Sequence, residues 1–118
     1  MRDIKFRAWD GLRMTCCGIT FNNTTWSIQN VNGEPIMQYT GLKDKNGVEI
    51  YEGDFVSHWH EEMFFQGNVV GLVVWQPDTA CFEFEYSSTS QPFSNVDFNY
   101  IEPQIIGNIY ENPELVDE

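Results

Sequence analysis

The chain contains no lysine or arginine after position 45. Its six basic residues all fall within the first 45 positions together with four acidic ones, so this part carries a net charge of +2. The remainder holds fourteen acidic residues, which accounts for the net charge of −12. Proteins that bind nucleic acid need clustered Lys and Arg to neutralise phosphates. The acidic part is therefore expected to repel nucleic acid, and its charge predicts either solubility alone or attraction of a basic partner.

Cysteine is scarce, with only Cys16, Cys17 and Cys81. This spacing contains no Cys-x-x-Cys metal motif, and the odd number argues against the disulfide framework of a secreted protein. The sequence also lacks the run of about 20 apolar residues that crosses a membrane, and it begins without an apolar signal segment. Reduced thiols, a cytoplasmic location and no membrane partner are expected.

Motifs of the common enzyme classes are missing as well. The patterns Gly-x-Ser-x-Gly, Gly-x-x-x-x-Gly-Lys and Gly-x-Gly-x-x-Gly do not occur, so no cofactor is predicted. The nearest approach to a metal site is His58, His60 and Glu62, which would face the same way on a strand and could hold zinc or iron. The alternative is that these side chains lie at an exposed strand end and are simply solvated.

The stretch from residue 38 to residue 56 predicts two tight turns around one short strand. Asn46 and Gly47 favour the positive φ angles of a two-residue hairpin turn. Gly53 can adopt angles closed to other residues, and Asp54 can accept a hydrogen bond from the backbone just beyond it. The chain is therefore expected to reverse twice within this stretch.

Alternation of apolar and polar residues predicts further strands. They cover residues 3–9, 12–14, 19–21, 26–28, 36–39, 69–75, 82–86, 96–100 and 105–110, with a hairpin turn at residues 10–11. Gly71 indicates a bulge or a sharp bend, and Glu83 and Glu85 are expected on a solvated face. Residues 112–114, Asn-Pro-Glu, predict a short helical turn. Many short strands without a 3.6-residue periodicity indicate a single all-β domain over residues 1–118.

Three blocks of sequence carry a resemblance to a known family. They are residues 1–10, 38–54 and 106–113, and they span the chain. In these blocks the sequence resembles the YopX family of phage and prophage proteins. The resemblance implies a phage or prophage accessory protein with an SH3-like small β-barrel over residues 38–118, preceded by an N-terminal β extension over residues 1–37. It implies no activity, and it assigns no functional residue.

Aromatic residues are plentiful: nine Phe, five Tyr and four Trp. Most are expected in the core, but exposed aromatics flanked by acids are a means of holding basic or Pro-containing peptides. Tyr51, Asp54 and Trp59 are the candidate binding residues, because residues near the Gly53 turn would lie at a barrel rim. Another copy of the chain could also cover an aromatic surface, and strand pairing through the N-terminal hairpin would allow such self-association.

The sequence thus favours a non-catalytic protein-binding module whose partner is a protein, for example a host factor, and which forms a homo-oligomer. Two alternatives stay open. One is a metal-dependent hydrolase that uses His58, His60 and Glu62. The other is an acidic mimic of nucleic acid that inhibits a host enzyme, which requires acids spaced like phosphates on one face.

Overall fold

The structure is a computed structural model that describes residues 4–17, 19–22, 25–28, 35–62, 64–86, 90–93 and 98–117. Most of the secondary structure in these ranges is strand. In chain order the elements are β1 Phe6–Trp9, β2 Met14–Cys17, β3 Ile19–Asn22, β4 Thr25–Ile28, β5 Ile36–Lys43, β6 Glu49–Tyr51, β7 Asp54–Glu62, β8 Phe65–Gln76, β9 Cys81–Glu85, β10 Ser90–Pro92, the single helical turn α1 Phe98–Ile101, β11 Gln104–Asn108 and the 3₁₀ turn η2 Pro113–Asp117.

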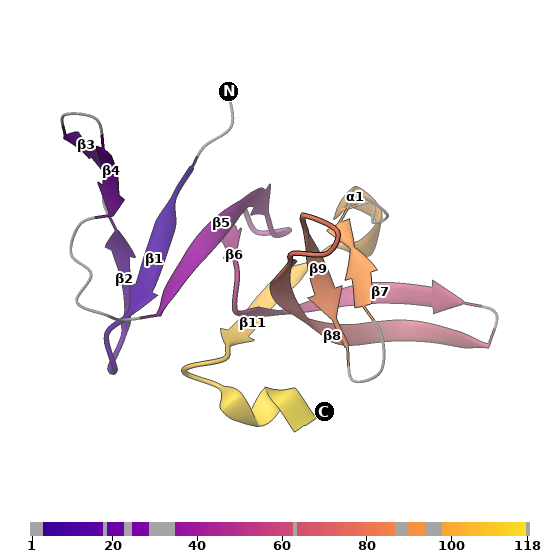
Figure 1. Ribbon diagram of the computed structural model, residues 1–118. Coiled ribbons are helices and arrows are strands. Elements are labelled where there is room, and N and C mark those ends of the chain that lie inside the picture. Colours follow the sequence, from indigo (N-terminus) through magenta and orange to yellow (C-terminus); the bar gives the residue numbers. More distant parts are fainter. Residues whose placement is uncertain are drawn as a thin grey trace.

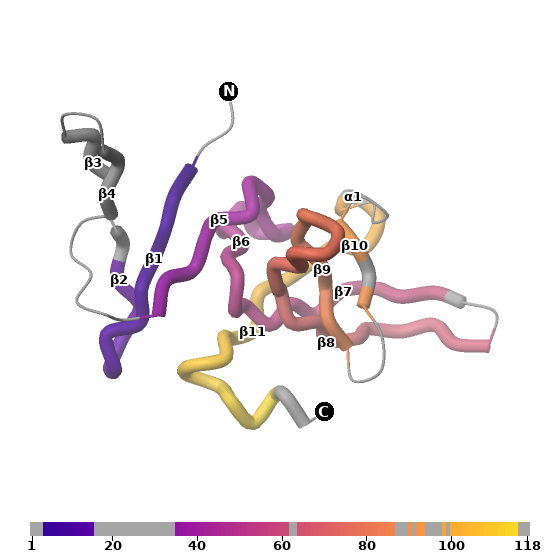
Figure 2. The backbone as a smooth tube through the Cα atoms, viewed as in Figure 1, coloured from indigo at the N-terminus to yellow at the C-terminus, as the bar shows by residue number. Residues whose placement is uncertain are grey.

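The strands form two main antiparallel sheets and a separate hairpin (Figure 1). The N-terminal sheet has the order β2-β1-β5-β6, the C-terminal sheet has the order β10-β9-β8-β7-β11, and β3 pairs with β4. Figure 2 shows the long β7–β8 hairpin extending away from the N-terminal sheet. The predicted all-β architecture is confirmed.

The predicted N-terminal hairpin forms, but its turn covers residues 10–13 instead of 10–11, and its second strand is β2, residues 14–17, instead of residues 12–14. β1 pairs with β2 so that Trp9 lies opposite Met14. The carboxylate of Asp10 accepts hydrogen bonds from the backbone N–H groups of Leu12 and Arg13, each at 2.8 Å, and this closes the turn. The two strands predicted at residues 19–21 and 26–28 also pair, as β3 and β4.

Both turns predicted within residues 38–56 form, but the first is not the predicted two-residue hairpin turn, because Lys43 pairs with Glu49 and Asn46 does not have a positive φ angle. Gly47 and Gly53 have φ angles of 82° and 86°, a region that L side chains rarely enter. The predicted role of Asp54 is wrong in detail, because its carboxylate accepts from the N–H of Tyr51, three residues before it. The boundary predicted between residues 37 and 38 falls inside β5.

Of the bulge or sharp bend predicted at Gly71, the bulge does not form. On β7, Val56 lies opposite Gly71 and Phe55 lies opposite Leu72, so the β7–β8 register has no shift at this point. Leu72 also pairs with Glu85 of β9 on its other side. A Cβ at Gly71 would lie 2.9 Å from the Cβ of Phe84. The glycine is therefore needed for close packing of β8 against Phe84 of β9.

The hydrophobic core lies mainly between strands of the C-terminal sheet and the segments that cover it. Its fully packed members are Ile50, Val56, Val73, Phe82, Phe84 and Ile101. Glu83 also lies inside, which corrects the prediction that it faces solvent with Glu85. Its carboxylate accepts a hydrogen bond from the Thr79 hydroxyl at 3.1 Å, so the turn before β9 supplies the polar partner that burial requires.

The strand predicted over residues 96–100 is wrong, because Phe98–Ile101 forms the helical turn α1. Phe98 and Ile101 both pack against the core, whereas Tyr100 is exposed. A spacing of three residues between the inward side chains fits one helical turn and excludes an extended strand. Residues 96 and 97 lie outside the described ranges.

The C-terminal elements follow the prediction closely. β11 covers most of the expected last strand and carries an irregularity between Ile105 and Gly107. The short helical turn is η2, which starts at Pro113. Asn112 does not cap it through its side chain; instead its Oδ1 accepts from the N–H of Asn108 at 3.3 Å and closes the turn that precedes η2.

Candidate functional site

The predicted binding residues Tyr51 and Asp54 lie at the junction of the two sheets. Arg7 reaches this junction from β1, and its Nη2 donates to Asp54 Oδ1 at 2.8 Å and to the carbonyl of Glu52 at 3.1 Å. The second carboxylate oxygen of Asp54 accepts from the N–H of Tyr51 at 2.8 Å. Asp54 is 2% exposed, so this ion pair is buried.

The Arg7–Asp54 pair is enclosed by aromatic rings, so its role is to stabilise the fold. The guanidinium of Arg7 lies over the ring of Tyr51 at 4.7 Å, and the ring of Tyr39 lies 5.5 Å from that of Tyr51. Burial raises the pKa of Asp54, while the charge of Arg7 and the Tyr51 N–H oppose that rise. The expectation that Tyr51 is exposed at a rim is wrong, because Arg7 and Tyr39 cover it.

His58 is built into the core. It is 3% exposed and its ring lies 4.8 Å from that of Phe84. Its Nδ1 lies 3.0 Å from the carbonyl oxygen of Trp59, and its Nε2 lies 2.6 Å from the hydroxyl of Tyr86. A carbonyl oxygen only accepts, so Nδ1 carries the proton and Nε2 accepts from Tyr86. Burial lowers the pKa of His58 and raises the pKa of Tyr86 to about 12.

The predicted metal ligands receive no support from the described residues. His60 lies two positions beyond His58 on β7, and its ring lies 6.2 Å from that of Phe65. The side chain of Glu62 is outside the description. Within the described ranges, no three His, Cys, Asp or Glu side chains gather as metal ligands, and both nitrogens of His58 are already engaged. The metal site stays a prediction.

Trp59, the third predicted binding residue, belongs to a surface group that we name the aromatic-acid cluster. Its members are Trp59, Glu61, Gln66 and Tyr100. The Tyr100 hydroxyl donates to Glu61 Oε2, and the amide of Gln66 donates to Glu61 Oε1 at 3.1 Å. The side chain of Trp59 interacts with Tyr100 and lowers its pKa. Strands β7 and β8 and the turn α1 therefore all contribute.

Register explains why these residues meet. Trp59 and Glu61 are two positions apart on β7 and so share a face, opposite to that of His58. Gln66 lies directly across from Glu61 in the β7–β8 pairing. α1 lies against β7, and the Tyr100 hydroxyl reaches Glu61 from there. Alternation could have predicted the first two residues of the cluster, but the contribution of Tyr100 depends on a contact across 39 positions.

The cluster holds a carboxylate in one orientation at the protein surface. The hydrogen bond to Glu61 raises the pKa of Tyr100, burial and the negative charge of Glu61 act in the same direction, and the interaction with Trp59 opposes them. Tyr100 is 56% exposed, and Phe64 at the tip of the hairpin is 93% exposed. A fixed carboxylate beside the accessible ring of Tyr100 is suited to a cationic side chain.

Together the fold and these surfaces define a small, acidic, all-β protein. No helix in the described ranges is long and apolar enough to cross a membrane. The chain belongs to the YopX protein family, whose model matches residues 14–117. It is similar to the crystal structure of protein EF1440 from Enterococcus faecalis, with 28% sequence identity and a TM-score of 0.64, over 98% of this chain and 99% of that chain. A search of curated proteins gives no match.

Proposed function

We propose that the protein is a non-catalytic phage or prophage accessory protein that binds a cationic segment of a partner protein in the cytoplasm of a bacterial host cell. Membership of the YopX family supports the phage assignment. The binding surface is the aromatic-acid cluster. The partner to test first is a host factor, because an accessory protein acts on its surroundings through such contacts.

We further propose that residues 38–118 form an SH3-like barrel, and the order of strands in the C-terminal sheet supports this. β7, β8, β9 and β10 pair as neighbours in sequence, and β11 returns beside β7 after the helical turn α1. A five-stranded antiparallel arrangement of this kind suits a small partly closed barrel. SH3 domains bind Pro-rich segments in grooves lined by aromatic side chains, and the exposed ring of Tyr100 with the half-buried ring of Trp59 would supply aromatic surface here.

The observation that carries the proposal is the position of the Glu61 carboxylate. Tyr100 and Gln66 each donate to one of its oxygens, so its orientation is set before any partner arrives. No basic residue follows position 45 in the sequence, and β7, β8 and α1 all come from this later part. A cationic side chain would therefore meet an ordered carboxylate and two aromatic rings without a competing charge from the same elements.

Fluorescence anisotropy with a labelled peptide of alternating Pro and Arg residues tests the proposal directly. Glu61→Gln should weaken binding about tenfold, as expected when one charge contact is lost. Glu114→Gln, which removes an exposed acid from η2, is the matched control and should bind like wild type. A peptide with Glu in place of Arg should not bind. Equal affinity of wild type and Glu61→Gln would exclude this surface.

A pull-down from host lysate then addresses the partner. Wild type and Glu61→Gln are compared at low and moderate salt, because screening weakens contacts between exposed charges. Proteins retained by wild type and lost with Glu61→Gln are the candidates. If both retain the same proteins, the partner binds elsewhere.

Mimicry of nucleic acid is the weaker proposal. Asp54 and Glu83 lie in the acidic part of the chain but are buried, so neither can stand for a phosphate on the surface. Asp54 is moreover engaged by Arg7. We therefore put the cationic protein segment first.

A further inference from the structure

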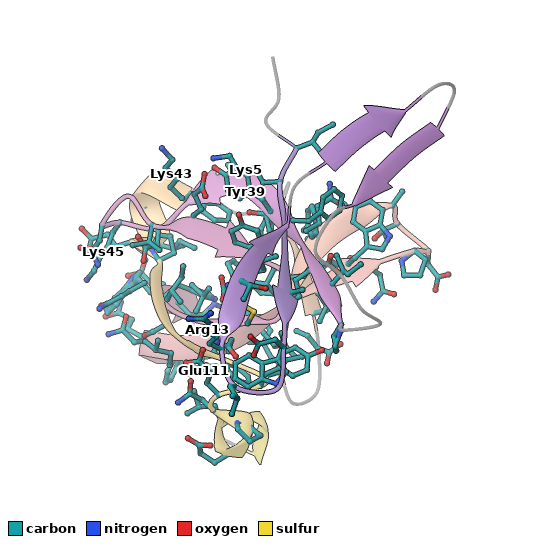
Figure 3. All side chains as sticks on the ribbon, turned by 90° about the vertical axis from the view of Figure 1, so that its left-hand side faces the viewer. Lys5, Arg13, Tyr39, Lys43, Lys45 and Glu111 are labelled. Carbon is teal, nitrogen blue, oxygen red and sulfur yellow. The ribbon has the colours of Figure 1, made fainter. Side chains whose placement is uncertain are left out.

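Some basic side chains of the described part form ion pairs within the molecule, and others do not. Arg7 pairs with Asp54, Lys5 with Glu49 and Arg13 with Asp10. Two others, Lys43 and Lys45, are exposed, and neither has a carboxylate oxygen within 4.0 Å in the described part of the chain. Lys43 is the last residue of β5 and Lys45 lies in the connection to β6, and Figure 3 shows both projecting outward on one side, away from Arg13.

Apolar side chains lie beside the two lysines. Leu42 is 38% exposed and Val48 is 52% exposed. We name residues 42–48 the cationic turn. Two cations beside two accessible aliphatic side chains are suited to an interface in which apolar contact accompanies charge pairing.

The cationic turn is held rigidly against the segment that follows α1. The carboxylate of Asp44 accepts from the N–H groups of Asn46 and Val48, each at 2.9 Å, and from that of Ile105 at 3.1 Å. The N–H of Lys45 donates to the carbonyl of Pro103 at 2.7 Å. Because its backbone is fixed in this way, the turn presents its lysines without a large cost in ordering.

The same segment connects the cationic turn to the aromatic-acid cluster. Pro103, which binds the turn, follows two residues after α1, and Tyr100 of α1 donates to Glu61. The cationic turn and the ordered carboxylate are thus both attached to residues 100–103. Because one molecule carries both charges, two copies can pair them reciprocally about a two-fold axis.

We propose that two copies of this chain associate symmetrically, with the cationic turn of each copy on the aromatic-acid cluster of the other. The proposal rests on the proposed function, since it names the cation that the cluster takes, namely Lys43 or Lys45 of a second copy. The net charge of −12 repels two copies at long range. That repulsion is screened beyond about 8 Å at physiological ionic strength, whereas the paired charges are in contact.

Charge exchange tests the proposal, with mass in solution measured by sedimentation equilibrium on the full chain. Wild type should form dimers at micromolar concentration. The double variant Lys43→Glu, Lys45→Glu and the single variant Glu61→Lys should each dissociate at least tenfold more readily. A mixture of the two variants should dimerise again, because each turn then meets a cluster of opposite sign. Arg13→Glu is the matched control and should dimerise like wild type.

Each outcome bears on the proposal. Wild type that stays monomeric at hundreds of micromolar would overturn it, and binding of the Pro-Arg peptide would show that the proposed function nevertheless holds. A dimer that neither charge variant weakens would lie elsewhere, for example along β2, the outer strand of the N-terminal sheet, and would also overturn it. Should Glu61→Lys fail to fold by circular dichroism, Glu61→Gln serves in its place, and dimerisation equal to that of wild type would count against the proposal.

Discussion

Arg7 in β1 and Asp54 in β7 form a buried ion pair, 2.8 Å long, across 47 positions of sequence. It connects the basic beginning of the chain to its acidic remainder, and the N-terminal sheet to the C-terminal sheet. In the described part of the chain, Arg7 Nε is a buried polar atom without a hydrogen-bond partner. The two bonds from its Nη2, to Asp54 and to the Glu52 carbonyl, engage two of the five N–H donors of the guanidinium.

Asp54→Asn should lower the free energy of unfolding by about 3 kcal/mol, because removing one partner of a buried pair leaves the other charge uncompensated. Urea denaturation measures the change. Arg13→Gln removes an ion pair between exposed side chains, 3.8 Å long, and should change stability little. Similar losses in the two variants would mean that the buried pair has no special role in joining the sheets.

Gly71→Ala should destabilise the protein by about 1–3 kcal/mol, the usual cost of overpacking a core. The new Cβ would lie 2.9 Å from the Cβ of Phe84, an atom that cannot move without its backbone. At Gly67 on the same strand, the nearest atom is the Cζ of the exposed Phe65 ring at 3.3 Å, which can turn aside. Gly67→Ala should thus be tolerated, and thermal unfolding of both variants compares them.

Stability should fall as the pH is lowered from 7.5 to 5.5, because burial lowers the pKa of His58 in the folded protein. The unfolded chain binds a proton near pH 6.5 while the folded chain resists it, so the contribution is complete above that pH and is lost as the pH falls through the folded pKa. Urea denaturation across this range measures the slope. His58→Gln should flatten it, and His60→Gln should retain it since His58 is still present. An unchanged slope in His58→Gln would contradict the assignment.

Asp44→Ala should cost about 2 kcal/mol of unfolding free energy, because three backbone N–H groups lose their acceptor and Asp44 is buried. The loss should also loosen the cationic turn from β11, which amide hydrogen exchange at Ile105 would detect. Asp10→Ala is the control for a turn-closing aspartate at the surface, and it should have a smaller effect on stability. Faster exchange at Ile105 in the control would show that the effect is not local.

Local signals predicted the turns and hairpins well. Gly47 and Gly53 adopt positive φ angles because the turn requires them whatever lies elsewhere in the chain. The strand alternation in β9 correctly placed Phe82 and Phe84 in the core but put Glu83 in solvent. That error arose because alternation shows only that neighbouring side chains point to opposite faces of the sheet. Whether the second face is also buried depends on the segments that pack against it.

The candidate site was predicted less completely. Trp59 was expected at a binding surface on account of its position near a turn, and it does join the aromatic-acid cluster. Alternation over residues 96–100 predicts a strand for Tyr100. The three-residue spacing of the inward side chains Phe98 and Ile101 belongs instead to a helical turn. A search for helical spacing just before Pro103 would have indicated the turn α1.

The amino-acid sequence alone determined the all-β class, the positions of the tight turns, the family and the separation of charge along the chain. These depend on backbone sterics and on the order of residues, which are properties of neighbours. The tertiary structure decided which charges pair and which stay accessible: Arg7 is buried on Asp54, Glu61 is held by Tyr100, and Lys43 and Lys45 have no ion-pair partner among the described residues. Such pairings join segments far apart in sequence, so they exist only once the sheets have packed.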